Sequence, residues 1–221
     1  MTTVASPVVV LGAGSWGTAL AILLARNGQP TTLWGRDVEY MAQLADRRCN
    51  ARFLPDTVFP QNLQTTSDLA QALGTASDSV VAVPSHAFRA ILKLLAAQAS
   101  ASLRVACATK GMEPGTGQFP HQVAHEILGD AHAFAVISGP TFAREVAAGL
   151  PTAVTVASSN AQFAGELAAR LHSDGFRAYT SDDVTGVQLG GAVKNVLAIA
   201  AGIADGLGLG ANTRAALITR G

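Results

Sequence analysis

The sequence predicts an α/β protein with a Rossmann-type, doubly wound and mostly parallel sheet, followed by the start of an all-α second domain. Three observations predict this class. Short apolar runs of strand type alternate with amphipathic helical segments up to about Asp182. A glycine-rich turn joins the first strand to the first helix. Beyond that point only helical periodicity continues, so we expect a first domain over residues 1–184 and an incomplete helical domain over residues 185–221.

The elements follow from local pattern in chain order. Runs such as VVVLG, TTLW and AFAVIS are rich in β-branched and aliphatic residues, which favour strands, and the segments between them repeat apolar residues every three or four positions, which favours helices. The expected strands span residues 8–12, 30–34, 79–83, 103–109, 133–138, 153–158 and 177–180. The expected helices span residues 15–27, 38–46, 86–98, 161–172 and 189–207, and one further helix is expected to begin at about residue 141.

Composition limits the classes of function. Of the 221 residues, 49% are hydrophobic and only 14% are charged, so we expect more surface than usual to be buried against a partner or a second domain. Fifteen basic and fifteen acidic residues leave no net charge, which argues against nucleic acid as a partner. Cys49 and Cys107 are too few for a disulfide framework or a zinc site and fit a reduced cytoplasmic location. The N-terminus lacks the basic region of a signal peptide.

Lys194 lies in an otherwise apolar helical segment, residues 189–207, whose other charge is Asp205. The segment is long enough to raise the question of a membrane span, but its charges and glycines favour a buried helix and no membrane insertion. Burial would lower the pKa of this lysine toward values useful for proton transfer, whereas a lysine that snorkels to water is the simpler alternative. Lys194 shares its helical face with Gly190, Gly191, Ala198, Ala201 and Asp205, and the bulky Val196, Ile199, Ile203 and Leu207 lie on the opposite face.

The glycine-rich turn has the pattern GxGxxG and predicts a dinucleotide site. Gly12 permits the tight turn, Gly14 allows a pyrophosphate to approach the backbone, and Gly17 allows close packing of helix on strand. The helix that follows supplies N–H donors and a favourable dipole for the phosphates. The pattern is weak evidence alone, but it lies here within a strand–turn–helix unit.

The end of the second expected strand discriminates between nicotinamide cofactors. Gly35 stands where an acidic residue usually holds the ribose hydroxyls of NAD, and Arg36 follows it. A guanidinium pairs with a 2′-phosphate, so NADPH is favoured. Asp37, one residue later, leaves NADH open as the cofactor, and a solvated loop cation is the simpler interpretation of Arg36.

Three further strand ends carry polar residues toward the same edge of the sheet, where ligands of open α/β sheets bind. Ser85 is a candidate helix cap, and the neighbouring His86 is a candidate proton donor or simply a surface histidine. Lys110 would suit an anionic or carbonyl-bearing substrate. Residues 138–141, which read SGPT, would form an anion-binding nest at a helix start. Together these ends predict one site.

Six segments in order carry a resemblance to a known family: GAGSWGTALA, LWGRD, AVPSHAFR, ATKGME, SGPTFAREVAAGLPTAV and GAVKNVLAIAAGIADGLGLGANTRAALITRG. The chain resembles bacterial-type NAD(P)-dependent glycerol-3-phosphate dehydrogenases over almost its whole length. The SGPTFA and GAVKN segments argue against other two-domain dehydrogenases, such as 3-hydroxyacyl-CoA dehydrogenases or ketopantoate reductases.

The resemblance implies roles for individual residues. Lys194 would be the proton donor or acceptor, and Lys110 would contact both cofactor and substrate. The other cofactor-binding residues would be Gly12, Gly14, Ser15, Trp16, Gly17, Arg36 and Ala143, and the other substrate-binding residues would be Gly139, Thr141 and Asn195.

The resemblance also implies a reaction and its setting. Hydride would pass between NAD(P)H and dihydroxyacetone phosphate or sn-glycerol 3-phosphate, a small phosphate substrate, and the product would feed phospholipid synthesis. The full-length protein would be a cytoplasmic homodimer. Members of this family continue beyond the LITRG segment, where they carry an aspartate near the catalytic lysine and an Arg-Asn pair for the substrate phosphate. We therefore expect a catalytically incomplete NADPH-binding fragment as the alternative to an active enzyme.

Overall fold

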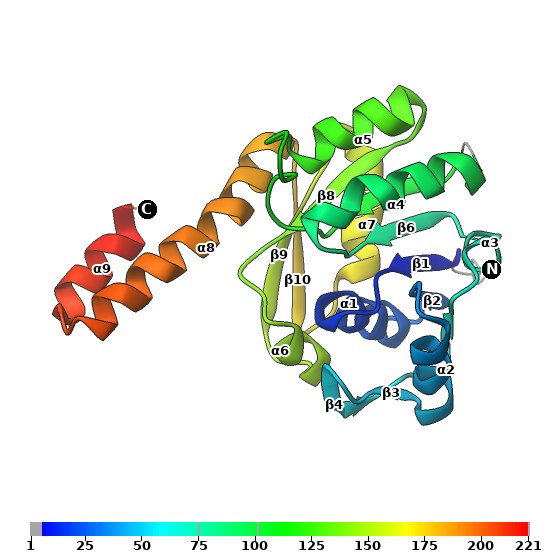
Figure 1. The fold of residues 1–221 in the computed structure, drawn as a ribbon, viewed down its shortest axis with the longest axis horizontal. Helices are drawn as coiled ribbons and strands as arrows, with labels where there is room; N and C mark the ends of the chain where they lie inside the picture. The colour runs from blue at the N-terminus through cyan, green and yellow to red at the C-terminus, as the bar shows by residue number, and fades with distance from the viewer. Residues whose placement is uncertain (1–5, 75, 101, 221) are drawn as a thin grey trace.

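The structure is a computed structural model that describes residues 6–74, 76–100 and 102–220. It contains one large sheet with helices on both faces, a small two-stranded sheet and a helical arm (Figure 1). The strands are β1 (Val8–Leu11), β2 (Thr31–Trp34), β3 (Cys49–Asn50), β4 (Leu54–Val58), β5 (Leu63–Thr66), β6 (Asp78–Val81), β7 (Arg104–Cys107), β8 (Phe134–Ser138), β9 (Thr152–Ala157) and β10 (Phe176–Ser181). The helices are α1 (Ser15–Arg26), α2 (Val38–Arg47), α3 (Leu69–Leu73), α4 (Ser85–Gln98), α5 (Pro120–Leu128), η1 (Gly129–Ala131), α6 (Ala143–Ala148), α7 (Ala161–Leu171), α8 (Val184–Gly206) and α9 (Gly210–Arg220).

The large sheet confirms the predicted fold class. Its strand order is β10-β9-β8-β7-β6-β1-β2-β5, and every neighbouring pair is parallel except β8 with β9. The chain winds outward from β1 through β2 and β5, then returns and winds outward through β6, β7 and β8, which is the doubly wound order of dinucleotide-binding sheets. The ligand edge of such a sheet lies at the carboxyl ends of its parallel strands.

Alternate residues of the central strand face two separate cores. Val8 and Val10 pack with α1, α2, α6 and α7, whereas Val9 and Leu11 pack with α3, α4 and α5. All four side chains are fully buried, as expected for a strand covered by helices on both faces. Figure 1 shows α4 on one side of β1 and β6 and α1 on the other.

The sequence analysis missed the elements between α2 and β6 and also missed α5. The segment over residues 48–77 contains β3, β4, β5 and α3. β5 is the edge strand and reads LQTT, with one fully buried residue, so it lacks the apolar run that identifies the inner strands. A proline at the first position of α5 is a typical helix start that the analysis did not use.

The strand β9 runs antiparallel to β8, because the connection between them is too short for a crossover. α6 has only six residues, and it ends at Gly149, whose left-handed φ of 78° turns the chain back at once. A helix of that length rises about 9 Å, which does not return the chain to the other edge of the sheet. This helix was predicted to begin at about Thr141, and it begins two residues later, at Ala143.

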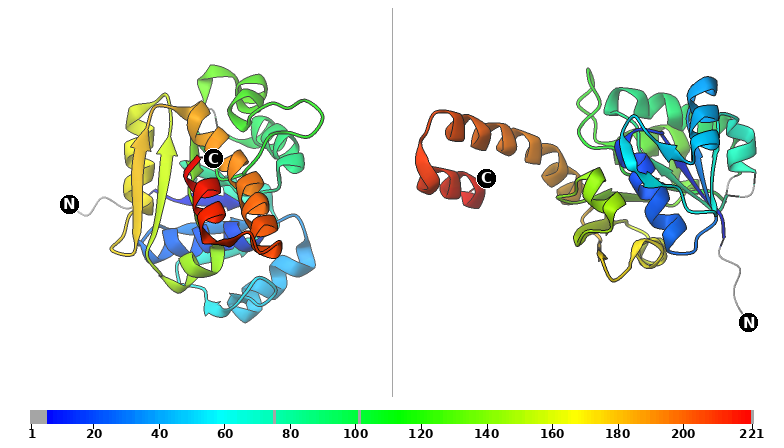
Figure 2. Two further views of the ribbon diagram at one scale, coloured as in Figure 1. Left: turned by 90° about the vertical axis from the view of Figure 1, so that its left-hand side faces the viewer. Right: turned by 90° about the horizontal axis from the view of Figure 1, so that it is seen from below.

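The helix α8 begins at Val184, five residues before its predicted start at Leu189, because the Asp183 carboxylate caps it and accepts a hydrogen bond from Gly186 N at 2.7 Å. From the amino edge of the sheet α8 crosses β8, with Val184 and Val187 packed on the core, and then leaves the sheet. It forms an arm with α9 (Figures 1 and 2).

The prediction that this apolar helix is buried is wrong for the described residues. Only 12% of its most apolar window is buried, because beyond the sheet α9 is the main element that packs against it. In the described part of the chain α8 is also the one helix long and apolar enough to cross a membrane. Length and composition are weak evidence for a span, since core helices of soluble proteins share them.

A buried carboxylate ties the sheet to α7 at the edge opposite the ligand edge. Asp78, at the start of β6, is fully buried and accepts hydrogen bonds from Arg104 at 2.6 and 3.0 Å. Arg170 of α7 approaches the same carboxylate at 3.2 Å. The Arg104 guanidinium also lies 4.7 Å from the ring centroid of Phe163. Asp78 therefore compensates the charge of Arg170 and shares that of Arg104 with the partly exposed Glu166 of α7.

We expect Asp78→Asn to lower the free energy of unfolding by about 3–5 kcal/mol, because it removes the buried counter-charge of Arg170 and leaves Arg104 with the partly exposed Glu166. Asp205→Asn is the matched control, since Asp205 pairs with Arg214 at 3.6 Å and both side chains are at least half exposed. The control should change the free energy by less than about 1 kcal/mol. Urea unfolding followed by circular dichroism measures both, and equal losses would contradict the prediction.

Candidate functional site

The glycine turn has the geometry that its pattern predicts. Gly12 has a φ of 119°, and a Cβ there would lie 2.5 Å from the carbonyl oxygen of Ala82. A Cβ on Gly17 would lie 1.9 Å from the Gly12 oxygen. A Cβ on Gly14 would meet nothing within 4 Å, so this glycine borders open space at the start of α1. Two glycines thus permit the fold, and one leaves room for a ligand.

A cavity of about 400 Å³ opens beside this turn at the carboxyl edge of the sheet. Trp16 Nε1 and Thr141 Oγ1 are buried and have no hydrogen-bond partner among the described residues. Unpartnered buried polar atoms are costly, so a ligand in the cavity that bonds to them would remove that cost. The cavity is lined by Gly14, Ser15, Trp16, Ala82, Val83, Pro84, Ala108, Thr109, Lys110, Thr141, Phe142 and Ala143.

Lys110 follows β7 and lies in the wall of this cavity. Its Nζ donates a hydrogen bond to the Gly139 carbonyl oxygen at 3.2 Å and lies 5.7 Å from the ring centroid of Trp16. Burial, and then the positive charge of Lys194, lowers the pKa of Lys110 below its ordinary value. The structure therefore places the two lysines close enough to repel each other.

Lys194 is partly exposed, which agrees with the alternative of a lysine that reaches water. Its Nζ lies 5.2 Å from the ring centroid of Phe142, whose side chain is 64% exposed. The α8 helix has left the sheet at this point, so one side of the lysine stays open.

Residues 138–141 do not form the predicted anion nest. The N–H of Thr141 donates to the Gly139 oxygen at 3.0 Å, and Pro140 has no N–H. A Cβ on Gly139 would lie 2.7 Å from the oxygen of Ala153, so close packing of β9 requires glycine here. This turn presents the Gly139 carbonyl to Lys110 and the Thr141 hydroxyl to the cavity.

The end of β2 shows why the usual acidic residue is absent. A Cβ on Gly35 would lie 2.6 Å from the sulfur of Met41, so a larger residue there requires the Met41 side chain to move. Asp37 is the N-cap of α2, and its Oδ1 accepts a hydrogen bond from Tyr40 N at 2.9 Å. Arg36 lies between them with its side chain exposed.

The remaining predicted residues have mixed outcomes. Ser85 is the first residue of α4 and makes no cap hydrogen bond, because Pro84 takes the N-cap position. His86 is exposed, as expected for a surface histidine. The side chain of Asn195 lies outside what the structure describes. Phe142 was not assigned a role from the sequence, although it belongs to the SGPTFA segment and lies beneath Lys194.

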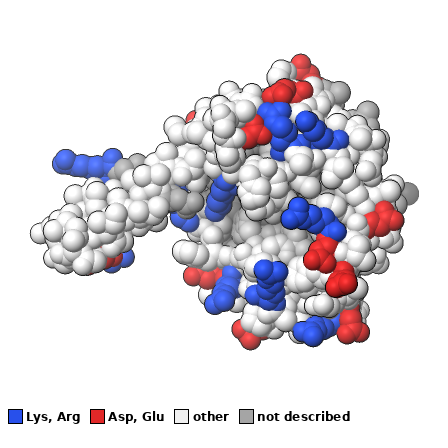
Figure 3. Space-filling model, viewed as in Figure 1, with Lys and Arg blue, Asp and Glu red and all other residues white. Residues whose placement is uncertain are grey.

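The surface around the site is hollowed and partly basic. Figure 3 shows Lys and Arg side chains beside the hollow where the sheet domain meets α8, whereas the arm itself carries few charges on this face.

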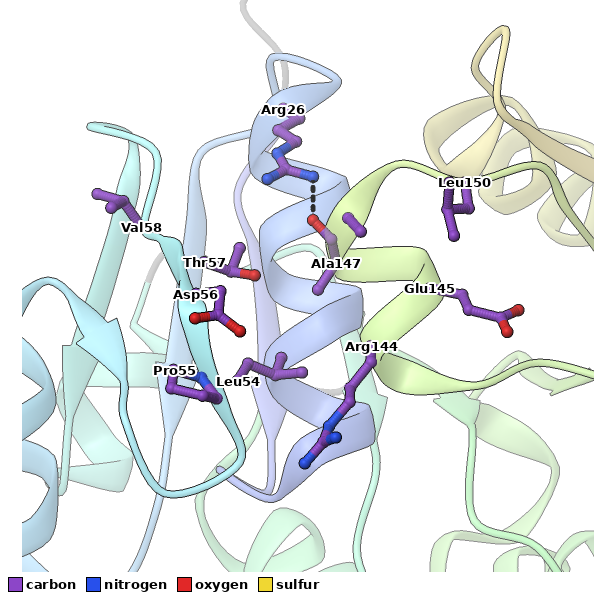
Figure 4. A pocket seen from close by; sticks show the side chains of 11 residues that line it. Arg26, Leu54, Pro55, Asp56, Thr57, Val58, Arg144, Glu145, Ala147 and Leu150 are labelled. Carbon is purple, nitrogen blue, oxygen red and sulfur yellow. Dashed lines mark hydrogen bonds between the residues drawn. The ribbon is translucent and has the colours of Figure 1, made fainter.

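A separate cavity of about 600 Å³ lies between β4, α1 and α6 (Figure 4). Arg26 donates to the Ala147 carbonyl oxygen at 2.6 Å there, so this guanidinium ties α1 to the end of α6.

Comparisons with known proteins place these features in a family. A family model described as the N-terminus of NAD-dependent glycerol-3-phosphate dehydrogenase matches residues 7–164, and the corresponding C-terminus model matches residues 183–221. The chain is 59% identical to glycerol-3-phosphate dehydrogenase [NAD(P)+] of Nitrosococcus oceani and 54% identical to that of Haemophilus influenzae strain Rd, over 96% and 100% of this chain. It spans 62% and 66% of the length of these two relatives.

A solved structure agrees with these matches. The crystal structure of glycerol-3-phosphate dehydrogenase from Coxiella burnetii superposes with a TM-score of 0.92 at 47% identity. The alignment covers 99% of this chain and 66% of that one.

Two glycine substitutions should separate folding from ligand binding. Gly17→Ala should lower the free energy of unfolding by about 1–3 kcal/mol, because its Cβ collides with the Gly12 carbonyl. Gly14→Ala should change it by less than about 0.5 kcal/mol but weaken dinucleotide binding, because its methyl group enters open space at the turn. Thermal unfolding and nucleotide titration measure the two effects. A larger loss of stability in Gly14→Ala would contradict this assignment.

The chain contains three lysines, so their titration is readily resolved. Lys194→Met should raise the pKa of Lys110, because it removes the neighbouring positive charge, but burial should keep that pKa below 10.5. Competitive acetylation across a pH series, read by peptide mass spectrometry, measures it. The exposed Lys93 of α4 is the internal reference. An unchanged Lys110 titration would show that the two ammonium groups do not interact.

Proposed function

The chain belongs to the NAD-dependent glycerol-3-phosphate dehydrogenase family, and from this premise we propose that it carries the cofactor site and part of the substrate site of an oxidoreductase. The proposed reaction is hydride transfer between NAD(P)H and dihydroxyacetone phosphate or sn-glycerol 3-phosphate. One observation carries the proposal: Lys110 lines a cavity together with the unpartnered Trp16 Nε1 and Thr141 Oγ1, and Lys194 lies over Phe142 of the same lining.

The proposed cofactor site fits a dinucleotide. Gly12, Gly14 and Gly17 form a turn with open space at its centre, and Ser15 and Trp16 begin the helix whose N-terminus faces that space. Lys110 and Ala143 line the far part of the same cavity. When bound, the nicotinamide would supply or accept the hydride.

NADPH is the proposed cofactor, because the residues at the end of β2 favour a 2′-phosphate. Gly35 offers no carboxylate to the ribose, and the Asp37 carboxylate already caps α2. The exposed Arg36 guanidinium is therefore the charged group available to the ribose, and it pairs with a phosphate better than with hydroxyls. NADH is the second choice. The Asp37 carboxylate accepts more than one hydrogen bond, so it can bond to a ribose hydroxyl while it caps α2.

The proposed substrate site lies between the two lysines. We assign substrate contacts to Lys110, Gly139, Thr141, Lys194 and Asn195. Reduction of the ketone leaves an alkoxide that needs a proton, and we assign its donation to the Lys194 ammonium, which lies over Phe142 of the cavity lining. Lys110 would orient the substrate and stabilise the developing negative charge, because it is held by the Gly139 carbonyl.

We propose two domains, residues 1–184 and 185–221, and a cytoplasmic homodimer. β10 ends at Ser181 and α8 begins at Val184, after which the described residues are helical. The exposed apolar side chains of α8 and α9 support burial against further protein. Two free cysteines, one of them fully buried, fit a reducing compartment. The product of the reaction would supply phospholipid synthesis.

A second candidate function is NADPH binding without catalysis. The exposure of α8 beyond the sheet favours it, because a proton-transfer site works best when water is excluded.

Tryptophan fluorescence with NADPH and NADH, beside an assay of NADPH consumption with dihydroxyacetone phosphate, separates the two candidates. We expect NADPH to bind and Arg36→Ala to weaken its binding about tenfold, a loss of about 1.4 kcal/mol, with little effect on NADH. The matched control Arg47→Ala removes an exposed arginine of α2 and should have no effect. Lys194→Met should leave binding intact and lower turnover by about 10²–10⁴-fold.

Binding without turnover in the unchanged chain supports the second candidate. No binding of either nucleotide would contradict both.

A further inference from the structure

Gln188 is a buried amide on α8, between the sheet and Lys194. Its side chain lies in the part of the helix that crosses β8, and the residue is only 6% exposed. Gln188 Oε1 lies 2.6 Å from Nδ1 of His121 on α5. An amide oxygen only accepts hydrogen bonds, so this nitrogen of His121 carries the proton. Gln188 Nε2 has no hydrogen-bond partner among the described residues.

A small crevice lies beside this amide, behind the Lys110 side chain. Its volume open to the centre of a water molecule is about 10 Å³, which is close to the space that one water requires. Gln188, Lys110, Ser138 and Thr109 are the polar residues among those that line it. The Gln188 amide N–H groups and the Lys110 ammonium are donors, and the Ser138 hydroxyl both donates and accepts. A single water, which accepts two hydrogen bonds and donates two, matches this set.

The contact between α8 and β8 holds the crevice in place. A Cβ on Gly191 would lie 2.6 Å from Ser138 Oγ, so α8 packs directly on the end of β8 at this level. Gln188 and Gly191 are three residues apart and therefore share a face of the helix. Lys194 is three residues further along. The same stretch of helix thus forms the crevice and carries the second lysine toward the cavity.

We propose that Gln188 is a positioning residue, which holds one water molecule in this crevice and through it orients and solvates the Lys110 ammonium. This inference deepens the proposed function, on which it rests, because it explains how a lysine behind the substrate site keeps its charge. A buried ammonium loses its hydration, and a fixed water returns part of it. The Gly139 carbonyl accepts one of the three ammonium hydrogens, so others are free to donate to the water.

The charged and titratable groups around Lys110 are few. Lys194 on α8 is the charge that acts on it, and His121 on α5 is the titratable group next to Gln188. Among the described residues no carboxylate contributes to the pKa shift of Lys110, so changes at Gln188 should be visible in its titration.

Two substitutions of similar volume should move that titration in opposite directions. Gln188→Met removes the amide and leaves an apolar crevice, so the pKa of Lys110 should fall. Gln188→Glu places a carboxylate beside the water, so the pKa of Lys110 should rise. A residue that only supports the fold would leave the pKa of Lys110 unchanged in Gln188→Met, so this variant tests the role of the amide, whereas Gln188→Glu tests whether position 188 faces Lys110. Competitive acetylation of the whole chain, with Lys93 as reference, measures the shift.

The matched control is Gln162→Met, the same change at an exposed glutamine of α7 that donates to Glu166 at 2.8 Å. It should leave Lys110 unchanged. Should Gln188→Met fail to fold, Gln188→Glu still decides, because it keeps the shape and one oxygen, and an unmoved or lowered pKa of Lys110 in that variant overturns the proposal. A crystal structure of the chain with no water bonded to Gln188 Nε2 also overturns it. Acetylation needs neither cofactor nor turnover, so its result is independent of the NADPH titration that tests the proposed function.

Discussion

The absence of a side chain at Gly17 sets how closely α1 approaches the end of β1, and the rest of the site depends on that distance. A methyl group there would overlap the Gly12 carbonyl, so the start of α1 would have to move outward. Trp16 and Ser15 line the cavity from this start, and α6 packs along α1. The helix α6 in turn follows the turn that carries Thr141. A single backbone contact therefore determines the shape of both walls of the cavity.

The sequence predicted the sheet well, because its inner strands are continuous apolar runs that only burial on both faces explains. It also predicted that the segments ending at Ser15, Lys110 and Thr141 meet, since the carboxyl ends of parallel strands share one edge. It did not predict the reversal at β9 or the edge strand β5, because both depend on loop length and pairing partners rather than on pattern. The sequence analysis also did not predict that desolvation acts on Lys110 while Lys194 stays partly exposed, for a similar reason. A helical wheel shows which residues share a face, but not where the helix leaves the sheet.

The two lysines are suited to different tasks because their surroundings differ. Lys110 is held by a carbonyl oxygen and an aromatic ring in a low-dielectric wall, which favours a fixed orientation. Lys194 lies over the exposed ring of Phe142 and has freedom to move toward a ligand. Cation–π contacts of this kind contribute about 0.5–1 kcal/mol at exposed sites, so the ring favours one position of the ammonium but does not prevent it from moving.

The antiparallel strand β9 has a consequence for the way Lys194 reaches the cavity. Because β9 and β10 both run against β8, the chain leaves the sheet at its amino edge, and α8 must travel the length of β8 before its lysine arrives at the carboxyl edge. From Val184 to Lys194 the helix rises about 15 Å, close to the length of a five-residue strand. The first ten residues of α8 thus have about the length needed to cross the sheet from its amino edge to its carboxyl edge. One inserted residue would advance the lysine by only about 1.5 Å but swing it about 100° around the axis, away from the cavity. The number of residues in this stretch is consequently under tighter constraint than their identity.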